Sequence, residues 1–391
     1  MSNEMSVKVP FYRHSLDSGS SVRVGDVLDT PFLTSGATGR AVEDQLCAFF
    51  GVPHALLVNS WTNGAVATLL ALGIGPGDEV IVPAMTFIAT ANVIELVTSK
   101  PVFVDIDPDT LLMAPKAARA ALTPATRAVI PVHLYGQMVD MKALRDALRD
   151  RPDVAIIEDS AHCFEGNLNG ARPGQDSDAA IFSFYATKNV TCGEGGAVIT
   201  RRTDLYENVA QTRFHGMSSI AIDRFRGGGY RHWDMLRLGT KANMPDLLAA
   251  LLPPQIESIQ DRLPVRDSLC RRYEEAFAET PIRLVKAVPG AVSARHLFAI
   301  HVPPDVRDEA IRILNANGIE VTVNYRSVPT LSYYREKYGY RPSDFPVSYE
   351  WGQGTLSLPL YPSLSEAQQD HVISVIRDKV SPLMERASHV A

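Results

Sequence analysis

Two neighbouring stretches decide how this chain folds: AIIEDSAHCFEG at residues 155–166 and AIFSFYATKNVTCGEGGAVIT at residues 180–200. Each begins with an apolar run that ends abruptly in polar residues, which is typical of a strand buried in a parallel sheet. Asp159 and His162 follow the first run, and Lys188 follows the second. Because ligands of open α/β sheets bind at the carboxyl ends of the strands, we expect these three side chains to converge there.

The same alternation extends along the chain on both sides of these strands. From about residue 55 to residue 200, short apolar runs such as ALLV, EVIVPA and VFVDID alternate with helical stretches such as TNGAVATLLALGI and TFIATANVIELV. This pattern predicts an α/β fold with a mainly parallel central sheet flanked by helices. Before it, GRAVEDQLCAFFG predicts an amphipathic helix that ends at Gly51.

The second half of the chain suggests a smaller domain. Residues 201–243 show no sustained periodicity and contain Gly227-Gly228-Gly229, so we expect a long functional loop or a subunit contact. Helices interrupted at Pro253-Pro254 are suited to bridging two domains, and the remainder mixes strands (HLFAIHV, IEVTV) with helices. We predict a large domain over residues 1–245, including the N-terminal segment, and interdomain helices with a small C-terminal α/β domain over residues 246–391.

Composition excludes several classes of protein. The 391 residues include 38 Lys and Arg against 44 Asp and Glu, a net charge of −6, which argues against nucleic acid as a partner. Four scattered cysteines without a C-x-x-C pair fit a reducing cytoplasm. No apolar run approaches the roughly 18 residues of a membrane span, and Glu4, Lys8 and Pro10 interrupt any signal peptide. We therefore expect a cytoplasmic protein that does not cross a membrane.

Lysine and aspartate at such strand ends suit two linked tasks. Desolvation lowers the pKa of a lysine, and the neutral amine can form a Schiff base with a carbonyl group; Lys188 is the candidate. A pyridine ring works as an electron sink only while its nitrogen stays protonated, which a nearby anion enforces. Asp159 would hold that proton.

Neighbouring segments supply the other groups that a phosphorylated ring needs. The segment NSWTNGAV lies between a strand and a helix and offers Ser60, Thr62 and the amides around Asn63 to a phosphate. Ser183 adds a hydroxyl, and Phe87 offers an aromatic face. Taken alone, each of these residues is more often a helix cap, a turn residue or a core side chain than part of a binding site. Their joint placement at one sheet edge favours a binding site.

The motifs GPGDEVIVPAMTFIATAN, PVFVDIDPDT, AVIPVHLYGQMVDM, IIEDSAH, FSFYATKN and CGEGGAVIT together resemble the DegT/StrS family of pyridoxal-phosphate-dependent nucleotide-sugar aminotransferases. The resemblance runs from about Gly39 to the C-terminus and is strongest over residues 73–200. It implies the aspartate-aminotransferase-like architecture called fold type I, with pyridoxal 5'-phosphate bound to the large domain. It also implies a homodimer with active sites at the subunit interface.

The resemblance gives residues of this chain roles toward the cofactor. Lys188 matches the Schiff-base lysine, Asp159 the aspartate paired with the ring nitrogen, and Phe87 the aromatic that stacks on the ring. His162 occupies a position where relatives have His or Gln close to the cofactor. The phosphate-binding positions of the family correspond to Ser183, Thr62 and Asn63.

Two segments depart from the family pattern. Many relatives read S-G-T where this chain has Ser60-Trp61-Thr62, so an indole replaces a glycine beside the phosphate loop. Many relatives also have an Asn-Tyr-Arg-Met segment that reaches the phosphate in the partner subunit. Here LGTKANMPD places Lys241 and Asn243 at the Asn and Arg positions, where we expect them to bind the cofactor phosphate.

The activity implied by the resemblance is transfer of an amino group from L-glutamate to a nucleotide-linked keto-sugar. Sugar-dehydrating relatives have histidine in place of Lys188, so aminotransfer is favoured over dehydration. His162 and the KAN segment resemble those of relatives that act on 4-keto-6-deoxy sugars or 4-keto pentoses. The expected role is the biosynthesis of an amino sugar for a surface polysaccharide such as lipopolysaccharide, or for a natural product. The alternatives are a 3-keto-sugar or cyclitol aminotransferase, and a regulatory protein that binds the cofactor without turnover.

No metal is expected. A metal hydrolase would draw on His133, Asp140, Asp159 and His162, but no tight ligand spacing such as H-E-x-x-H supports one. Five further residues are candidates for contacts with the sugar or the diphosphate: His215, Arg231, His232, His296 and Tyr325.

Overall fold

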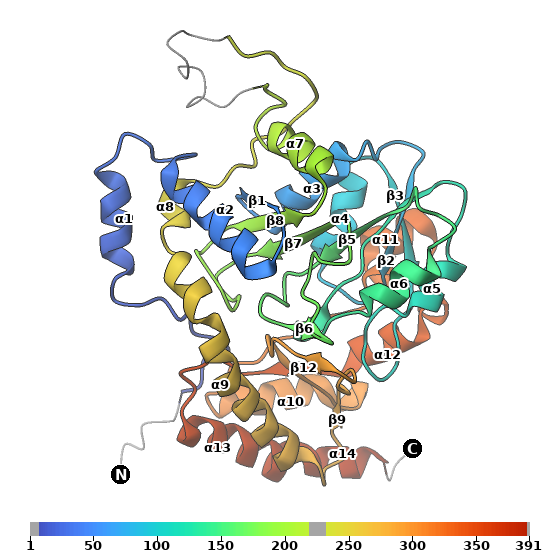
Figure 1. The fold of residues 1–391 in the computed structure, drawn as a ribbon. Helices are drawn as coiled ribbons and strands as arrows, with labels where there is room; N and C mark the ends of the chain where they lie inside the picture. Colours follow the sequence, from blue (N-terminus) through green and yellow to red (C-terminus); the bar gives the residue numbers. More distant parts are fainter. Residues whose placement is uncertain (1–7, 219–231, 389–391) are drawn as a thin grey trace.

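A seven-stranded sheet forms the centre of the protein (Figure 1). A computed structural model describes residues 8–218 and 232–388 and places the strands in the order β1-β8-β7-β5-β4-β2-β3. β8 pairs antiparallel with both of its neighbours, and the other adjacent strands pair in parallel. The mainly parallel sheet predicted from the sequence is confirmed. The strands are β1 (His54–Val58), β2 (Glu79–Pro83), β3 (Lys100–Val104), β4 (Thr126–Val129), β5 (Ala155–Asp159), β7 (Ala179–Ser183) and β8 (Gly196–Thr200).

The strands are apolar throughout because both faces of the sheet are covered. Alternate residues of one strand enter different cores: Ile157 of β5 packs on one side, and Ile156 on the other. On the first side lie α3 (Trp61–Ala71), α4 (Ile88–Leu96) and α7 (Thr203–Thr212). The opposite side is covered by α2 (Ala37–Phe50), α5 (Pro115–Ala120), α6 (Met141–Ala147) and the start of α9 (Pro253–Phe277).

Two helices differ in how well the sequence predicted them. α2 ends at Gly51, which has a left-handed φ of 65°, so the predicted helix and its end are both confirmed. α7 was not expected, because residues 201–243 were interpreted as a loop. It forms because Leu205 and Val209, four residues apart, pack in the core beside α3. The Gly227-Gly228-Gly229 segment and Arg231 lie outside the described residues.

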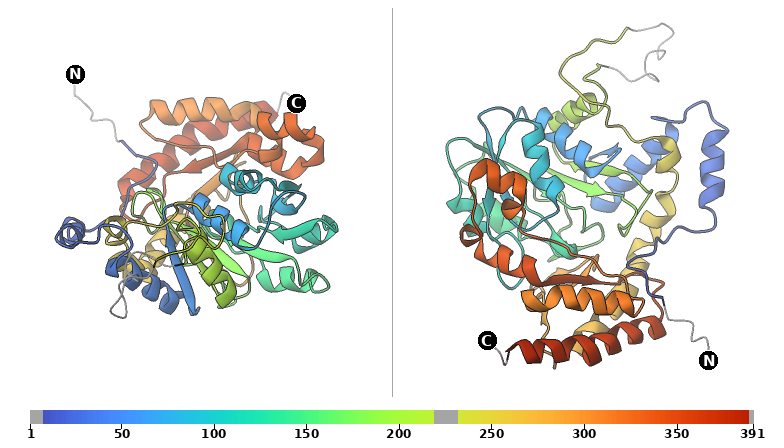
Figure 2. Two further views of the ribbon diagram at one scale, coloured as in Figure 1. Left: turned by 90° about the horizontal axis from the view of Figure 1, so that it is seen from above. Right: turned by 180° about the vertical axis from the view of Figure 1, so that it is seen from behind.

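A second lobe follows α8 (Asp246–Ala249) and contains a three-stranded antiparallel sheet (Figures 1 and 2). The predicted strand IEVTV at residues 319–323 is absent: Ile319 makes an isolated bridge to Val9, and Thr322 one to Ser357, so no continuous ladder forms. The lobe comprises β9 (Arg283–Leu284), β11 (Phe298–His301), β12 (Thr355–Leu358), α10 (Pro304–Ala316), α13 (Glu366–Val375), a π-helix (Ile376–Val380) and α14 (Ser381–Ser388).

The chain crosses between the two lobes more than once. The first half of α9 packs against the large lobe, and its second half lies in the core of the small one. Val9, near the N-terminus, is buried in the small lobe. Tyr334 and Phe345, late in the chain, pack with Phe103 in the large lobe. The remaining elements are α1 (Ser20–Leu28), β6 (Asn167–Leu168) paired with β10 (Ala291–Val292), α11 (Ser332–Tyr338) and α12 (Pro346–Gly354).

The contact of α3 with the sheet depends on Gly64. A Cβ atom at this position would lie 2.9 Å from Val58 Cγ2 and 3.2 Å from Val198 Cγ2. We predict that Gly64→Ala lowers the free energy of unfolding by about 1 to 3 kcal/mol, because the helix must move away from the strands. Chemical denaturation measures the change.

Gly25 provides the matched control, because it lies in α1 and a Cβ there would meet nothing within 4 Å. Gly25→Ala should raise stability by about 0.5 to 1 kcal/mol through the better helix propensity of alanine. Equal effects of the two substitutions would contradict the packing argument.

Candidate active site

A cavity of about 600 Å³ lies at the carboxyl ends of the parallel strands. Side chains from β5, β7 and the start of α3 and α4 meet there, as the sheet topology predicts. It is also lined by Phe11 and Tyr12 from the N-terminal segment, which no sequence pattern predicted. Among the predicted site residues, the cavity is lined by Thr62, Phe87, Asp159, His162, Ser183 and Lys188.

Asp159 is the last residue of β5 and is held by two donors. Its Oδ2 accepts a hydrogen bond from Thr90 Oγ1 at 2.8 Å, and its Oδ1 accepts one from the amide of Ala161 at 3.1 Å. Burial raises the pKa of Asp159, and these hydrogen bonds and the nearby amine of Lys188 oppose that effect. The sequence analysis missed Thr90, since one threonine in a helix carries no distinguishing signal. The result is a carboxyl group oriented rigidly at the cavity wall.

Lys188 follows β7 in a short turn, where its amide donates to the carbonyl of Tyr185 at 2.9 Å. Within the part of the chain that the structure describes, no hydrogen bond or ion pair engages its amine. Burial lowers the pKa of Lys188 to about 8, although the carboxylate of Asp159 attracts the ammonium form. About a tenth of the amine is therefore neutral and nucleophilic at pH 7, far more than of an ordinary lysine.

The start of α3 supplies donors for an anion. Ser60 caps the helix, its Oγ accepting from the amide of Asn63 at 3.1 Å. Trp61, the departure from the family pattern, is buried in the core, and the helix begins regularly despite it. β8 comes close to this turn because Gly196 has no side chain: a Cβ there would lie 3.0 Å from the Trp61 amide nitrogen. The side chain of Asn63 turns to Asn59, its Nδ2 donating at 2.8 Å, and does not line the cavity.

His162 and Tyr325 form a polar pair at the side of the cavity. His162 Nδ1 accepts from the amide of Tyr135 at 3.3 Å, so the ring proton lies on Nε2 and is donated to Tyr325 Oη at 3.2 Å. Burial lowers the pKa of His162 well below its usual value, so the ring is neutral. Phe87 lies nearby, with its ring centre 5.8 Å from that of Tyr325 and half of its surface exposed. These rings offer a flat surface to a ligand.

Lys241 and Asn243 lie outside this cavity in the same chain. Lys241 is exposed and its Nζ lies 4.3 Å above the centre of the Phe214 ring. Asn243 is buried, with Nδ2 donating to Ser35 Oγ at 2.9 Å. Of the five candidates for sugar or diphosphate contacts, His296 and Tyr325 line the cavity, while His215 and His232 do not.

Of the four residues of the metal-hydrolase alternative, only Asp159 and His162 line the cavity. His133 Nε2 lies 2.6 Å from Glu158 Oε2 in the interior, and Asp140 caps α6 through the amide of Ala143. Within residues 8–218 and 232–388, no group of three or more His, Cys, Asp or Glu side chains could hold a metal ion. The same residues include no helix long and apolar enough to cross a membrane.

Comparison with known proteins agrees with this geometry. A sequence model of the DegT/DnrJ/EryC1/StrS aminotransferase family matches residues 15–377. The chain belongs to this family. Among solved structures, it is 28% identical to the PMP form of the putative sugar aminotransferase Spr1654 from Streptococcus pneumoniae, with a TM-score of 0.89 over 96% of this chain and 100% of that one.

Two further solved structures are similar over nearly their whole length. DesV from S. venezuelae is 31% identical, with a TM-score of 0.85 over 95% of this chain and 98% of that one. The sugar aminotransferase CalS13 from Micromonospora echinospora is 25% identical, with a TM-score of 0.86 over 95% and 100%. The DegT/StrS family and the fold type I architecture predicted from the sequence are thus confirmed.

This member of the aminotransferase family is a transaminase that uses pyridoxal 5'-phosphate, and its cavity fits that cofactor. Asp159 would face the ring nitrogen, and Phe87 offers a face to the ring. The start of α3 with Ser183 offers donors to the phosphate, and Lys188 offers its amine to the aldehyde. When bound, the cofactor supplies an electron sink for carbanion chemistry.

Titration of Lys188 tests the electrostatics of the site. In cofactor-free protein, modification of Lys188 by an amine-reactive reagent should be half-maximal near pH 8, because only the neutral amine reacts. Asp159→Asn removes the charge that stabilises the ammonium form, so the acid dissociation constant of Lys188 should increase roughly tenfold. Mass spectrometry of the modified peptide measures the rate of modification against pH in the unchanged protein and in Asp159→Asn.

Thr90→Val is the control, since it removes a hydrogen bond to Asp159 but keeps the carboxyl group. It should change the titration of Lys188 less than Asp159→Asn does. An unchanged midpoint in Asp159→Asn would show that the carboxylate does not act on the amine.

Proposed function

We propose that this aminotransferase moves an amino group from L-glutamate to a nucleotide-linked keto-sugar, most specifically a 4-keto-6-deoxy sugar. The observation that supports it best is the half-buried Lys188 beside Asp159 in a cavity large enough for a substrate next to the cofactor. The resemblance to Spr1654 and CalS13, which are named as sugar aminotransferases, supports a sugar substrate. The product would be an amino sugar for surface polysaccharide or a natural product, made in the cytoplasm.

The residues divide the work of such a transfer. Lys188, once its amine is free, would carry a proton between the substrate and the cofactor. Asp159 keeps the ring nitrogen protonated. Tyr325 Oη accepts a hydrogen bond from His162 Nε2, so its own hydroxyl can donate to a polar atom in the cavity. Phe87 and Tyr325 restrict the plane of the ring.

A second copy of the chain would complete the site. Lys188 is the one Lys or Arg among the described residues that line the cavity, yet the site must hold a phosphate and a substrate carboxylate. Lys241 is exposed on the segment 235–241, which isolated bridges join to Phe214 and Met217 and in which Met235 and Leu238 are more than half exposed. We therefore propose a homodimer in which Lys241 reaches the phosphate of the partner's site.

The first experiment follows the visible spectrum of the protein with added pyridoxal phosphate before and after L-glutamate. We expect a yellow protein that bleaches with glutamate, and no yellow colour in Lys188→Ala. Addition of nucleotide-linked 4-keto-6-deoxy sugars should restore the colour, whereas 3-keto-sugars and cyclitol ketones should not. Bleaching that only a 3-keto-sugar or a cyclitol ketone reverses would move the assignment to that substrate class, and a yellow protein inert to glutamate would favour a regulatory role.

Hybrid dimers test the shared site. Lys188→Ala and Lys241→Ala should each be nearly inactive as homodimers, because each lacks one residue of every site. Co-expression should restore activity at about a quarter of all sites, since one site of each mixed dimer is intact. Lys188→Ala co-expressed with itself under a second affinity tag is the control, and absence of restored activity in the mixture would contradict the arrangement.

A further inference from the structure

His296 lies at the boundary between the active-site cavity and a second, very small one. It is 4% exposed and lines both the large cavity and an adjacent cavity of about 10 Å³. Its ring centre lies 4.4 Å from that of His162. The small cavity is also lined by Ser160, Lys188 and Asn189. The proposed function gives His296 no task.

The proton of the His296 ring is fixed by a buried amide. Asn189 Nδ2 donates to Glu165 Oε1 at 2.7 Å and to the carbonyl of Ala294 at 2.8 Å, so both amide hydrogens are engaged. Asn189 Oδ1 must then accept from His296 Nδ1, which lies 3.0 Å away. Burial lowers the pKa of His296 well below its usual value, so the ring is neutral. Its Nε2 is therefore a hydrogen-bond acceptor.

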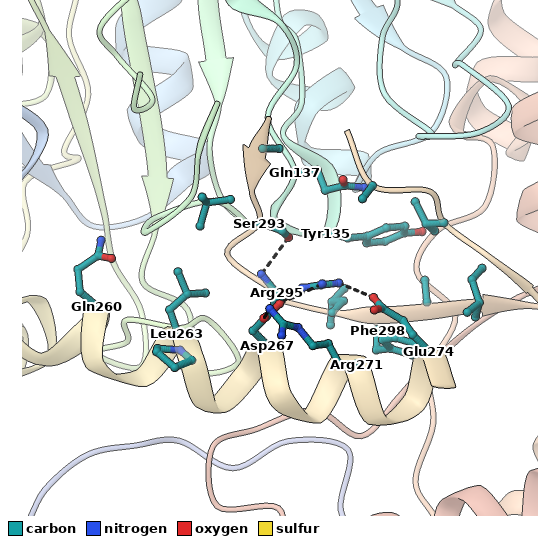
Figure 3. Close-up of a pocket in the computed structure, with 18 residues that line it drawn as sticks. Tyr135, Gln137, Gln260, Leu263, Asp267, Arg271, Glu274, Ser293, Arg295 and Phe298 are labelled. Atoms are coloured by element: carbon teal, nitrogen blue, oxygen red, sulfur yellow. Dashed lines mark hydrogen bonds and ion pairs between the residues drawn. The ribbon is translucent and has the colours of Figure 1, made fainter. Parts of the chain in front are cut away.

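Ion pairs hold the residue that precedes His296. Arg295 pairs with Asp267 at 3.0 Å and with Glu274 at 2.7 Å, both on α9 (Figure 3). The amide of His296 donates to the carbonyl of Tyr135 at 3.1 Å. These contacts fix the backbone at His296, and the hydrogen bond to Asn189 holds its ring.

Ser160 provides an independent indication of a ligand. Its hydroxyl is buried, and in the described part of the chain its Oγ has no hydrogen-bond partner. Buried hydroxyl groups in native proteins almost always have a partner, either protein or ordered water. The small cavity that Ser160 lines has about the volume that one water molecule needs.

We propose that this cavity binds one water molecule, held by Ser160 Oγ and His296 Nε2, and that His296 orients the free amine of Lys188 through it. The water accepts a hydrogen bond from Ser160 Oγ and donates one to His296 Nε2, and its remaining donor and lone pair are available to the amine of Lys188. His296 is thus a positioning residue. The inference rests on the proposed function, in which Lys188 is repeatedly freed and must return to one position.

The effect of His296 on Lys188 must be distinguished from the electrostatic effects of Asp159 and Glu165. Asp159 on β5 lies on the cavity side, and burial raises the pKa of Glu165, behind Asn189, to about 7. Arg266 of α9 lies beside Glu165 and opposes that shift. Glu165→Gln keeps an oxygen that can accept from Asn189 but removes the charge, so it isolates the electrostatic effect of Glu165.

The test measures the acid dissociation constant of Lys188 in full-length, cofactor-free protein by the pH dependence of amine modification. His296→Asn keeps an N–H group near Asn189 but loses the Nε2 acceptor. We expect an increase of about tenfold in the acid dissociation constant, because the ammonium form loses a hydrogen-bonded partner. Ser160→Ala should act in the same direction, and Glu165→Gln should leave the water contact intact.

His301→Asn is the matched control, since His301 is equally buried (3% exposed) in the small lobe and should have no effect. A crystal structure of the cofactor-free protein should show a water between Ser160 Oγ and His296 Nε2. The proposal would be overturned if the acid dissociation constant of Lys188 were unchanged in both His296→Asn and Ser160→Ala. A crystal structure without the water would overturn it as well. If His296→Asn does not fold, Ser160→Ala carries the test alone. The assay contains neither substrate nor cofactor, so it can be interpreted even if the proposed transfer reaction is wrong.

Discussion

The burial of Asp159 at the end of β5, and the partial burial of Lys188 in the turn after the adjacent parallel strand β7, is the constraint on which the rest of the structure depends. Removing ionisable groups from water is costly, and the cost is met here by packing on both faces of β5 and β7. The same burial lowers the pKa of the amine toward neutrality. A less deeply covered sheet would leave the lysine an ordinary surface cation with little nucleophilic character.

Around this pair, each polar group is limited to one hydrogen-bonding state. Thr90 and the Ala161 amide hold Asp159, the Tyr135 amide sets the proton of His162, and Asn189 sets that of His296. The two imidazoles are neutral and adjacent, but one presents a donor to the cavity side and the other an acceptor. Neutral rings of fixed tautomer can orient a ligand without adding charge to a site that already contains a lysine and a carboxylate.

The sequence predicted the parts of this arrangement that depend on local pattern. Apolar runs located the strands of the large sheet, and polar residues at their ends located Asp159 and Lys188. What it could not predict depends on long-range contacts. IEVTV has the composition of a strand, but its neighbours, Val9 and Ser357, pair with it at single positions. The partners of Asn189 come from segments 24 and 105 residues away, which no local spacing reveals.

The crossing of the chain between the lobes has a consequence for how the molecule is assembled. Val9 completes the core of the small lobe, whereas Tyr334 and Phe345 complete that of the large one. Neither core therefore corresponds to a continuous piece of the sequence. During synthesis from the N-terminus, the core of the large lobe cannot be completed before residues 334–345 have emerged, by which point most of the small lobe has also been made. Replacing either lobe by recombination would therefore require replacing two separate pieces of the sequence, because each core includes a segment distant from the rest of its lobe.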